Sequence, residues 1–336
     1  MSGFDLLVIG DANPDVLVFG APETPPAGQA ETLVDSGSLV LGGSAAIVAH
    51  GAARLGLSTA LVALVGRDPA GDFVLDTLSA AGVDIRGCTR HVSLPTALTV
   101  CLNRPDGDRA ILTAPGCLPA FGPEHVPDMA ARHVHAASYF LQPRLAAGLP
   151  ELLAAARAAG ASTSLDTNDD PAGAWRLAPG LPAVCDLLLP NEAEAVALAR
   201  TLTESPAGPA ANPGDPPAGT AANPGDRLAD ALVTLAAAGP TPVVKRGARG
   251  VVALRDGKIT SARGPAVAPV DAVGAGDGFD AGFLAGWLTS GDLAQALALG
   301  CACGSLSTRA AGGTAAQPGR AEAERLAAQV RITKCC

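Results

Sequence analysis

The 336-residue sequence is short of aromatic side chains, which make up 3% of it, and of charged ones, which make up 16%. Acidic residues outnumber basic ones by 32 to 23, for a formal net charge of −9. Nucleic-acid binders use basic patches and stacking rings, so this composition argues against a nucleic-acid partner. No stretch approaches the roughly 20 apolar residues of a membrane span, and the N-terminus lacks the basic segment of a signal peptide. We expect a cytoplasmic protein with no membrane partner.

The eight cysteines are scattered, and none forms a Cys-x-x-Cys pair or lies near histidines at zinc-binding spacing. This pattern argues against a common zinc site and against the disulfide framework of a small secreted domain. We expect six of the cysteines to be small core side chains of a reduced protein. These are Cys88, Cys101, Cys117, Cys185, Cys301 and Cys303.

Apolar runs typical of buried strands alternate along the chain with amphipathic segments typical of helices. Strands are predicted at 6–10, 59–65, 162–166, 184–189 and 242–245. Helices are predicted at 44–56, 69–81, 150–160, 192–202, 276–289, 292–310 and 320–330. Because strands that alternate with helices form parallel βαβ units, the sequence predicts a doubly wound α/β sandwich. Such sheets bind ligands beyond the carboxyl ends of their strands.

Two regions depart from this alternation, because they hold extended segments with no helix between them. One consists of residues 16–19 and 31–41, and the other of 96–103 and 109–113, joined by a Pro-Asp-Gly turn. We infer a small accessory sheet that projects from the sandwich. Ordinary β-hairpins on the rim of the large sheet are the alternative.

A tandem duplication interrupts the second half of the chain. Residues 205–215 and 216–226 are two undecamers of Pro, Gly and Ala-rich sequence that differ at two positions. They offer almost no apolar surface to bury, and two copies are too few for a solenoid. We therefore predict a disordered, low-complexity surface loop at 204–226.

The segment Asp271-Ala-Val-Gly-Ala-Gly-Asp277 carries most of the chemical information. Gly274, Ala275 and Gly276 precede a helical pattern, so their backbone N–H groups can converge on an anion at the start of that helix. A carboxylate beside bound phosphate is costly unless the reaction uses it, and accepting a proton from a hydroxyl is such a use. Helix capping by Asp277 is the alternative, and the residues alone leave both open.

This segment resembles the carboxy-terminal signature of the ribokinase/PfkB family of carbohydrate kinases, and residues 42–56 resemble its amino-terminal signature. Val65-Gly-Arg-Asp68, Ala80-Ala-Gly-Val-Asp84 and the Asn-x-x-Glu motif of Asn191 and Glu194 follow the order seen in the family. Asn13-Pro-Asp15 resembles its sugar-binding motif. The match extends over about residues 5–320, apart from the duplication, and several ordered motifs over that span are far more specific than one.

The resemblance implies a ribokinase-like α/β sandwich with a small β-sheet lid. The large nucleotide-binding domain would contain residues 1–13, 42–91 and 115–333, and the lid residues 14–41 and 92–114. Asp277 would be the base that activates the acceptor hydroxyl, and Gly274, Ala275 and Gly276 the anion hole. Asn191 and Glu194 would organise Mg²⁺ through water.

The resemblance also implies a nucleotide site and a cation site. Lys245, Gly247 and Gly250 would contact ATP together with Gly274 and Gly276, and a plain hairpin turn is the alternative for Gly247 and Gly250. Asp271 would help to hold a monovalent cation such as K⁺, with a loop near 310–314. Asp166, which ends a strand, either lines the nucleotide or magnesium side or caps a helix, and Arg109 either braces the lid or approaches the ligand.

The predicted substrate site departs from that of ribokinase. Asn13, Asp15, Gly42 and Gly43 would orient the acceptor, as in the family. Ile47, however, stands where many relatives have Asn, and Gln142 where ribokinase has an acidic residue. The site is therefore expected to be less polar than a ribose site.

Together these features predict an ATP-dependent kinase that acts on a primary hydroxyl of a sugar or sugar derivative. A nucleoside kinase of the same family is one alternative, and a catalytically silent ligand-binding relative is another. The uncovered sheet of the lid favours a homodimer through the lid, because such sheets tend to find a partner.

Overall fold

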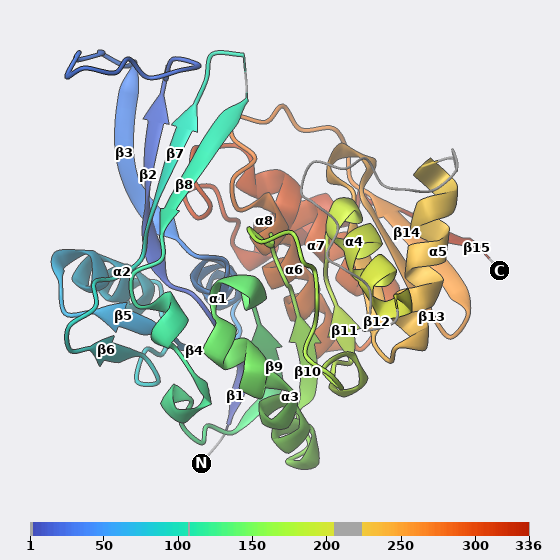
Figure 1. The fold of residues 1–336 in the computed structure, drawn as a ribbon. Coiled ribbons are helices and arrows are strands. Elements are labelled where there is room, and N and C mark those ends of the chain that lie inside the picture. The colour runs from blue at the N-terminus through green and yellow to red at the C-terminus, as the bar shows by residue number, and fades with distance from the viewer. Residues whose placement is uncertain (1–2, 107, 205–223, 336) are drawn as a thin grey trace.

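The computed structural model describes residues 3–106, 108–204 and 224–335. A nine-stranded sheet forms the centre of the molecule, with helices on both faces (Figure 1). In spatial order its strands are β15 (Arg331–Cys335), β14 (Lys258–Arg263), β13 (Val251–Arg255), β12 (Thr241–Lys245), β11 (Leu187–Leu188), β10 (Ser162–Leu165), β9 (Ala131–Ala136), β1 (Phe4–Ile9) and β4 (Thr59–Val62). The strands from β12 to β4 are parallel, and β13 to β15 add antiparallel strands at one edge. The predicted α/β sandwich is confirmed.

Helices pack on both faces because the strands are apolar on both. One core joins the sheet to α1 (Ser44–Arg54), α2 (Pro69–Ala80), α6 (Ala275–Ser290) and α7 (Leu293–Ser307), with α8 (Arg320–Ala327) against α7. The other joins it to α3 (Pro143–Ala158), α4 (Glu192–Thr203) and α5 (Pro224–Ala237). Successive side chains of a strand alternate, so Leu6 and Val8 of β1 enter the first core and Leu7 and Ile9 the second. Within the described ranges, no helix is long and apolar enough to cross a membrane.

A second sheet of four strands projects from the sandwich, at the upper left of Figure 1. Its strands, in spatial order, are β3 (Ser36–Gly42), β2 (Asn13–Phe19), β7 (Leu98–Asn103) and β8 (Arg109–Ala114). The accessory sheet inferred from the sequence is therefore present, although β3 begins at Ser36 and not at residue 31. Leu39, Ile111 and Leu112 are at least half exposed on it.

Two predicted strands are shorter than expected. The apolar run 59–65 divides into β4 and β5 (Leu64–Gly66), and β5 leaves the large sheet to pair with β6 (Thr89–His91). Every residue of that run is buried, so hydrophobicity did not show where the hydrogen-bonding partner changes. The strand expected at 184–189 is only β11, because residues 182–184 form a 3₁₀ turn.

Two predicted boundaries also differ. The helix expected from Pro150 begins at Pro143, which takes the favourable first position, and Pro150 lies inside it. Most of the predicted 204–226 loop, residues 205–223, lies outside the described residues. Its last three residues belong to the first turn of α5, contrary to the prediction. All six cysteines within residues 3–334 of the described chain are free thiols, five of them buried and Cys88 half-buried, as expected.

Candidate active site

Four charged side chains gather at the carboxyl ends of the parallel strands. Asp166 follows β10, Lys245 ends β12, and Asp277 and Asp280 lie in the first turns of α6. One carboxylate oxygen of each aspartate lies within 4.8 Å of the others, and all three side chains are buried. The Lys245 Nζ lies 2.6 Å from Asp166 Oδ2 and 3.0 Å from Asp280 Oδ2. The spacing of the carboxylates suits a cation, and Lys245 already supplies one.

The turn at Gly274 begins α6 in a conformation that favours glycine. Gly274 has φ +69°, and a Cβ there would lie 2.4 Å from the Cα of Gly313. A Cβ on Gly276 would lie 3.5 Å from the Lys245 Nζ, so the ammonium lies directly against this turn. The helix N-terminus and a neighbouring cation together create a site that favours an anion.

Asp277 is the carboxylate best suited to accept a proton at this site. It is 8% exposed, and burial, reinforced by the charge of Asp166, raises its pKa to about 7, whereas Lys245 lowers it. No N–H of the α6 first turn donates to its carboxylate among the described residues, and Gly274 is the N-cap. The capping alternative is therefore not what the geometry shows.

The predicted substrate residues lie where β2 and β3 meet α1. The Nδ2 of Asn13 donates to Asp15 Oδ1 at 2.9 Å, and a Cβ on Gly42 would lie 2.0 Å from the same oxygen. Gly43, the N-cap of α1, has φ +84°. Burial, together with the charges of Asp11 and Asp277, raises the pKa of Asp15 to about 7. Asp15 and Asp277 therefore lie within electrostatic reach of each other.

The two residues that depart from the ribokinase pattern are both buried. Ile47 packs from α1 against the 310–314 loop, since a Cβ on Gly313 would lie 2.5 Å from its Cδ1. Gln142 is fully buried, and its Nε2 donates to the carbonyls of Ala137 and Ser138 at 3.1 and 3.0 Å. Gln142 has no surface that a ligand can touch, so the predicted substrate contact is corrected. In the sequence, the position of Gln142 directly before Pro143, which begins α3, was the feature that indicated a structural role.

The motif predicted to organise magnesium forms a capping box on α4. The Asn191 Oδ1 accepts the Glu194 N–H at 3.0 Å, and Glu194 Oε2 accepts the Asn191 N–H at 2.8 Å. Burial raises the pKa of Glu194 to about 7, and the charge of Asp166 adds to this effect. Glu194 thus lies within electrostatic reach of the acidic cluster, and carboxylate and amide oxygens are ligands that suit Mg²⁺ directly or through water.

The predicted nucleotide loop connects β12 to β13 as a hairpin, which matches the alternative interpretation of its glycines. Gly247 has φ +55° with open space around it, whereas Gly250 has φ +84° and its Cβ would lie 2.1 Å from the Ala262 oxygen. The Lys245 ammonium contacts two aspartates, so a direct contact with a nucleotide, as predicted, would share the ammonium with both carboxylates.

Asp271 is buried, and several donors share its carboxylate. Its Oδ1 accepts the Val273 N–H at 2.9 Å and lies 3.3 Å from Nη1 of Arg109. Its Oδ2 accepts the Gly312 N–H at 3.0 Å, within the loop expected to hold a cation. Arg109 therefore braces the small sheet against the large domain, which is one of the two roles left open by the sequence.

Sequence reasoning missed two aspartates near the site. Asp11 follows β1, and its Oδ1 accepts the Ala45 N–H at 2.9 Å at the start of α1. Asp280 is completely buried, and its Oδ1 has no hydrogen-bond partner among the described residues. An aspartate on an otherwise apolar helix, one turn after Asp277, was the signal available in the sequence.

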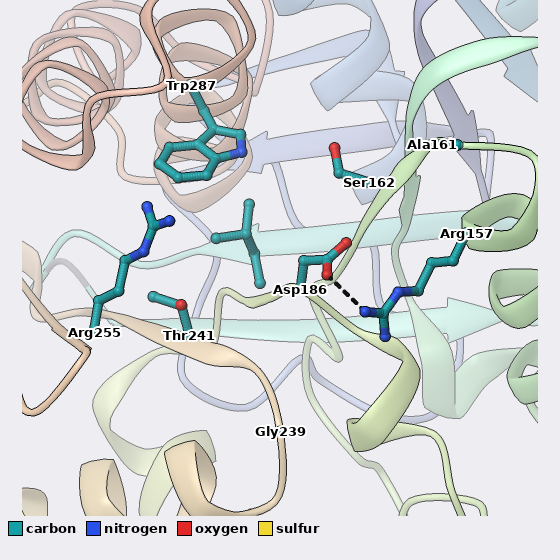
Figure 2. A pocket seen from close by; sticks show the side chains of 10 residues that line it. Arg157, Ala161, Ser162, Asp186, Gly239, Thr241, Arg255 and Trp287 are labelled. Atoms are coloured by element: carbon teal, nitrogen blue, oxygen red, sulfur yellow. Dashed lines mark ion pairs between the residues drawn. The ribbon is translucent and has the colours of Figure 1, made fainter.

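A hollow of about 510 Å³ lies at the opposite edge of the sheet (Figure 2). Its walls include the starts of β10, β11 and β12, whereas the acidic cluster lies at the ends of these strands. Arg157 pairs there with Asp186 at 3.3 Å, and Arg255 lies over the Trp287 ring at 4.8 Å. Because its charged groups already have partners and lie away from the Gly274 turn, this hollow is distinct from the candidate site.

Comparison with known proteins gives a consistent result. The profile of the pfkB family carbohydrate kinases matches residues 4–320. An ATP-dependent ribose-1-phosphate kinase of Halopiger xanaduensis is 31% identical over 275 residues, 79% of each chain. A fructokinase of Klebsiella pneumoniae is 30% identical over 331 residues, which cover 95% of this chain and 97% of the relative.

Solved structures share the fold. A ribokinase of Arabidopsis thaliana complexed with ribose and ATP superposes with a TM-score of 0.78 at 23% identity, covering 97% of this chain and 99% of that one. A putative ribokinase II of E. coli with ATP and Mg²⁺ gives 0.74 at 22%, with 96% and 98% covered. A nucleoside kinase of Methanocaldococcus jannaschii gives 0.74 at 20%, with 98% and 99% covered.

Proposed function

Because the chain belongs to the pfkB family of carbohydrate kinases, we propose that it transfers the terminal phosphoryl group of ATP to a primary hydroxyl of a sugar or sugar derivative. The observation that carries this proposal is the position of Asp277. Its buried carboxylate adjoins the glycine turn that begins α6 and lies within electrostatic reach of Asp15. A base, an anion site and a polar acceptor site therefore share one region.

In the proposed reaction, the oxygen of the acceptor hydroxyl attacks the terminal phosphorus of ATP, and Asp277 accepts the proton of that hydroxyl. The new O–P bond forms while the bond to ADP breaks, and the N–H groups of the Gly274 turn stabilise the charge on the transferred group. Asn13 and Asp15 orient the acceptor. Asn191 and Glu194 would hold Mg²⁺ through water, and the ion when bound neutralises charge on the phosphate oxygens.

ATP and Mg²⁺ are the proposed cofactors. Of the structures that share this fold, the Arabidopsis ribokinase was solved with ATP and the putative ribokinase II of E. coli with ATP and Mg²⁺. A potassium ion at Asp271, as the resemblance implies, would have to share that carboxylate with Arg109. We propose that the Arg109 guanidinium takes the place of potassium in this chain.

The acceptor is proposed to carry an apolar or non-hydroxylated portion. Ile47 gives the wall beside Gly313 no hydrogen-bonding group, and an unpartnered buried hydroxyl costs about 1–3 kcal/mol. This observation keeps a nucleoside as the second candidate, and a nucleoside kinase is among the structures that share the fold. The catalytically silent alternative is less well supported, because Asp277, Asn191 and Glu194 are all present.

The proposal also covers the assembly, the domain division and the location of the protein. Leu39, Ile111 and Leu112 leave apolar surface exposed on the four-stranded sheet, which supports a homodimer through this lid. The division into a large domain and a lid, with the boundaries given above, is part of the same proposal. The free thiols support a cytoplasmic location.

ATP consumption with a panel of acceptors tests this function. Ribose, fructose, ribose 1-phosphate and adenosine would each be assayed with Mg²⁺, with the D277N variant as the matched control. We expect turnover with at least one acceptor, and none above background with D277N, which retains nucleotide binding. Near-normal turnover in D277N would overturn the assignment of Asp277 as the base.

A further inference from the structure

The ammonium of Lys245 is unusually buried for a charged group. Its side chain is 13% exposed, and its Nζ contacts Asp166 at 2.6 Å and Asp280 at 3.0 Å. It also lies 3.5 Å from the position that a Cβ on Gly276 would take. Lys245 therefore ties the ends of β10 and β12 to the first turns of α6.

Stability alone is a poor reason for this arrangement. Removing charges from water costs several kcal/mol per ion, and replacing a buried ion pair by apolar side chains is often neutral or stabilising. The triad is also incompletely bonded, since Asp280 Oδ1 has no hydrogen-bond partner within the described part of the chain. A purely structural contact would gain more from apolar packing, so the cation has another use.

That use follows from what surrounds the ammonium. Asp166 contacts it from the end of β10 and Asp280 from α6, whereas Glu194 of α4 and Asp277 of α6 lie within electrostatic reach. Burial raises the pKa of Asp277 and Glu194 to about 7 and that of Asp280 well above its usual value, so Asp166 is the carboxylate that Lys245 balances. As the other three ionise, negative charge accumulates where an ATP phosphate is proposed to bind. Without Lys245, this charge would oppose phosphate binding, and the pKa of Asp277 would rise, so that less of Asp277 would be ionised.

We propose that Lys245 is a positioning residue, which fixes the Gly274–Gly276 turn and Asp277 in register with β10 and β12 and supplies positive charge beneath the transferred phosphate. This inference rests on the proposed function. In this proposal Lys245 acts on the reaction through the first turn of α6, and a direct contact between Lys245 and the nucleotide is not needed. Loss of the cation should therefore affect catalysis more than it affects the fold.

The test compares K245M with K258M, which changes an exposed lysine on β14, and with D280N and the double variant K245M/D280N. For K245M we expect kcat to fall about 100-fold, as for loss of one preorganised electrostatic partner. The acid limb of its pH profile should move to higher pH, because Lys245 lowers the pKa of Asp277. K258M should keep the wild-type kcat and profile.

The double variant separates a role in catalysis from a role in folding. In K245M/D280N the buried Asp280 carboxylate, which K245M leaves without a cation, is replaced by a neutral amide. The melting temperature of the double variant should therefore be higher than that of K245M, while its kcat stays low. If kcat and the melting temperature both recover in K245M/D280N, Lys245 matters only for folding, and the inference is overturned. A wild-type kcat and acid limb in K245M would overturn it as well.

Two further measurements keep the inference testable. If K245M does not fold, D280N, which keeps the Lys245–Asp166 contact, should fold and lose about tenfold in kcat; an unchanged kcat would contradict the inference. If the wild-type chain turns over no acceptor, the proposed function fails. Calorimetry with ATP then decides, because K245M must weaken ATP binding and K258M must not, and equal affinities would refute the role of Lys245.

Discussion

Arg109 and Asp271 join the small sheet to the large domain, with 3.3 Å between Nη1 and Oδ1. Arg109 begins β8, and Asp271 precedes the Gly274 turn by three residues. The Asp271 side chain is almost completely buried, so the contact places a negative charge inside the protein with one guanidinium opposite it. The position of the four-stranded sheet and the geometry of the Gly274 turn are therefore coupled through one ion pair.

Truncating this ion pair should impair the reaction. In R109A the Asp271 carboxylate stays buried without its charged partner and keeps only the backbone donors of Val273 and Gly312, which loosens both the small sheet and the segment leading into α6. We expect kcat/KM for the acceptor to fall at least tenfold, measured by steady-state kinetics. The control is R104A, because Arg104 lies on the same hairpin and pairs with acidic side chains of the small sheet and its loops. An equal loss in both variants would point to general damage to the lid.

Exchange of potassium tests whether Arg109 acts as the local cation. Replacing K⁺ by tetramethylammonium should leave the wild-type rate unchanged, because the guanidinium already faces Asp271. In R109A the same carboxylate is free to bind an ion, so added K⁺ should stimulate the rate. Strong potassium dependence of the wild-type enzyme would contradict this prediction.

Activity and stability should respond to pH in opposite directions. Burial raises the pKa of Asp277 to about 7, so the base is protonated at lower pH and kcat/KM should fall about tenfold per unit below this value. The raised pKa values of Asp15, Asp277 and Glu194 mean that the folded state binds protons more tightly than the unfolded state. The stability they contribute is present at low pH and is lost as pH rises through about 7.

The opposing trends can be measured on one preparation. Thermal unfolding should show a higher melting temperature at pH 5.5 than at pH 8.5, and D15N should reduce this difference. A melting temperature that rises with pH over this interval would mean that these carboxyls are not held in their neutral form.

The two glycines of the β12–β13 hairpin form a matched pair. Both have positive φ, and Gly250, with ψ −134°, lies in a region that is open mainly to glycine. In the left-handed helical region alanine costs about 1–2 kcal/mol. G247A adds only this cost because its surroundings are open, whereas G250A also drives a Cβ to 2.1 Å from the Ala262 oxygen. Urea unfolding should show G250A to be clearly the less stable variant. Equal losses would mean that the hairpin shifts to accommodate the methyl group.

Local chemistry explains which parts of the fold could be predicted. Ser44 to Arg54 and Glu192 to Thr203 combine helical periodicity with clear starts, so both helices were placed within two residues of their ends. The division of 59–65 between two sheets and the inclusion of Pro150 within α3 were not predictable. Each depends on which distant segment supplies the hydrogen bonds or the packing, and periodicity carries no such information.

The sequence by itself determined the alternation of strands and helices, the glycine turn before α6 and the presence of Asp277, because these depend on neighbours along the chain. Only the tertiary structure decided the partners of Lys245, Arg109 and Gln142. A long side chain can reach several groups, and its choice depends on residues up to 162 positions away that folding brings together. Burial then sets the charge of Asp15 and Asp277, because the solvent available to a carboxyl is a property of the folded chain.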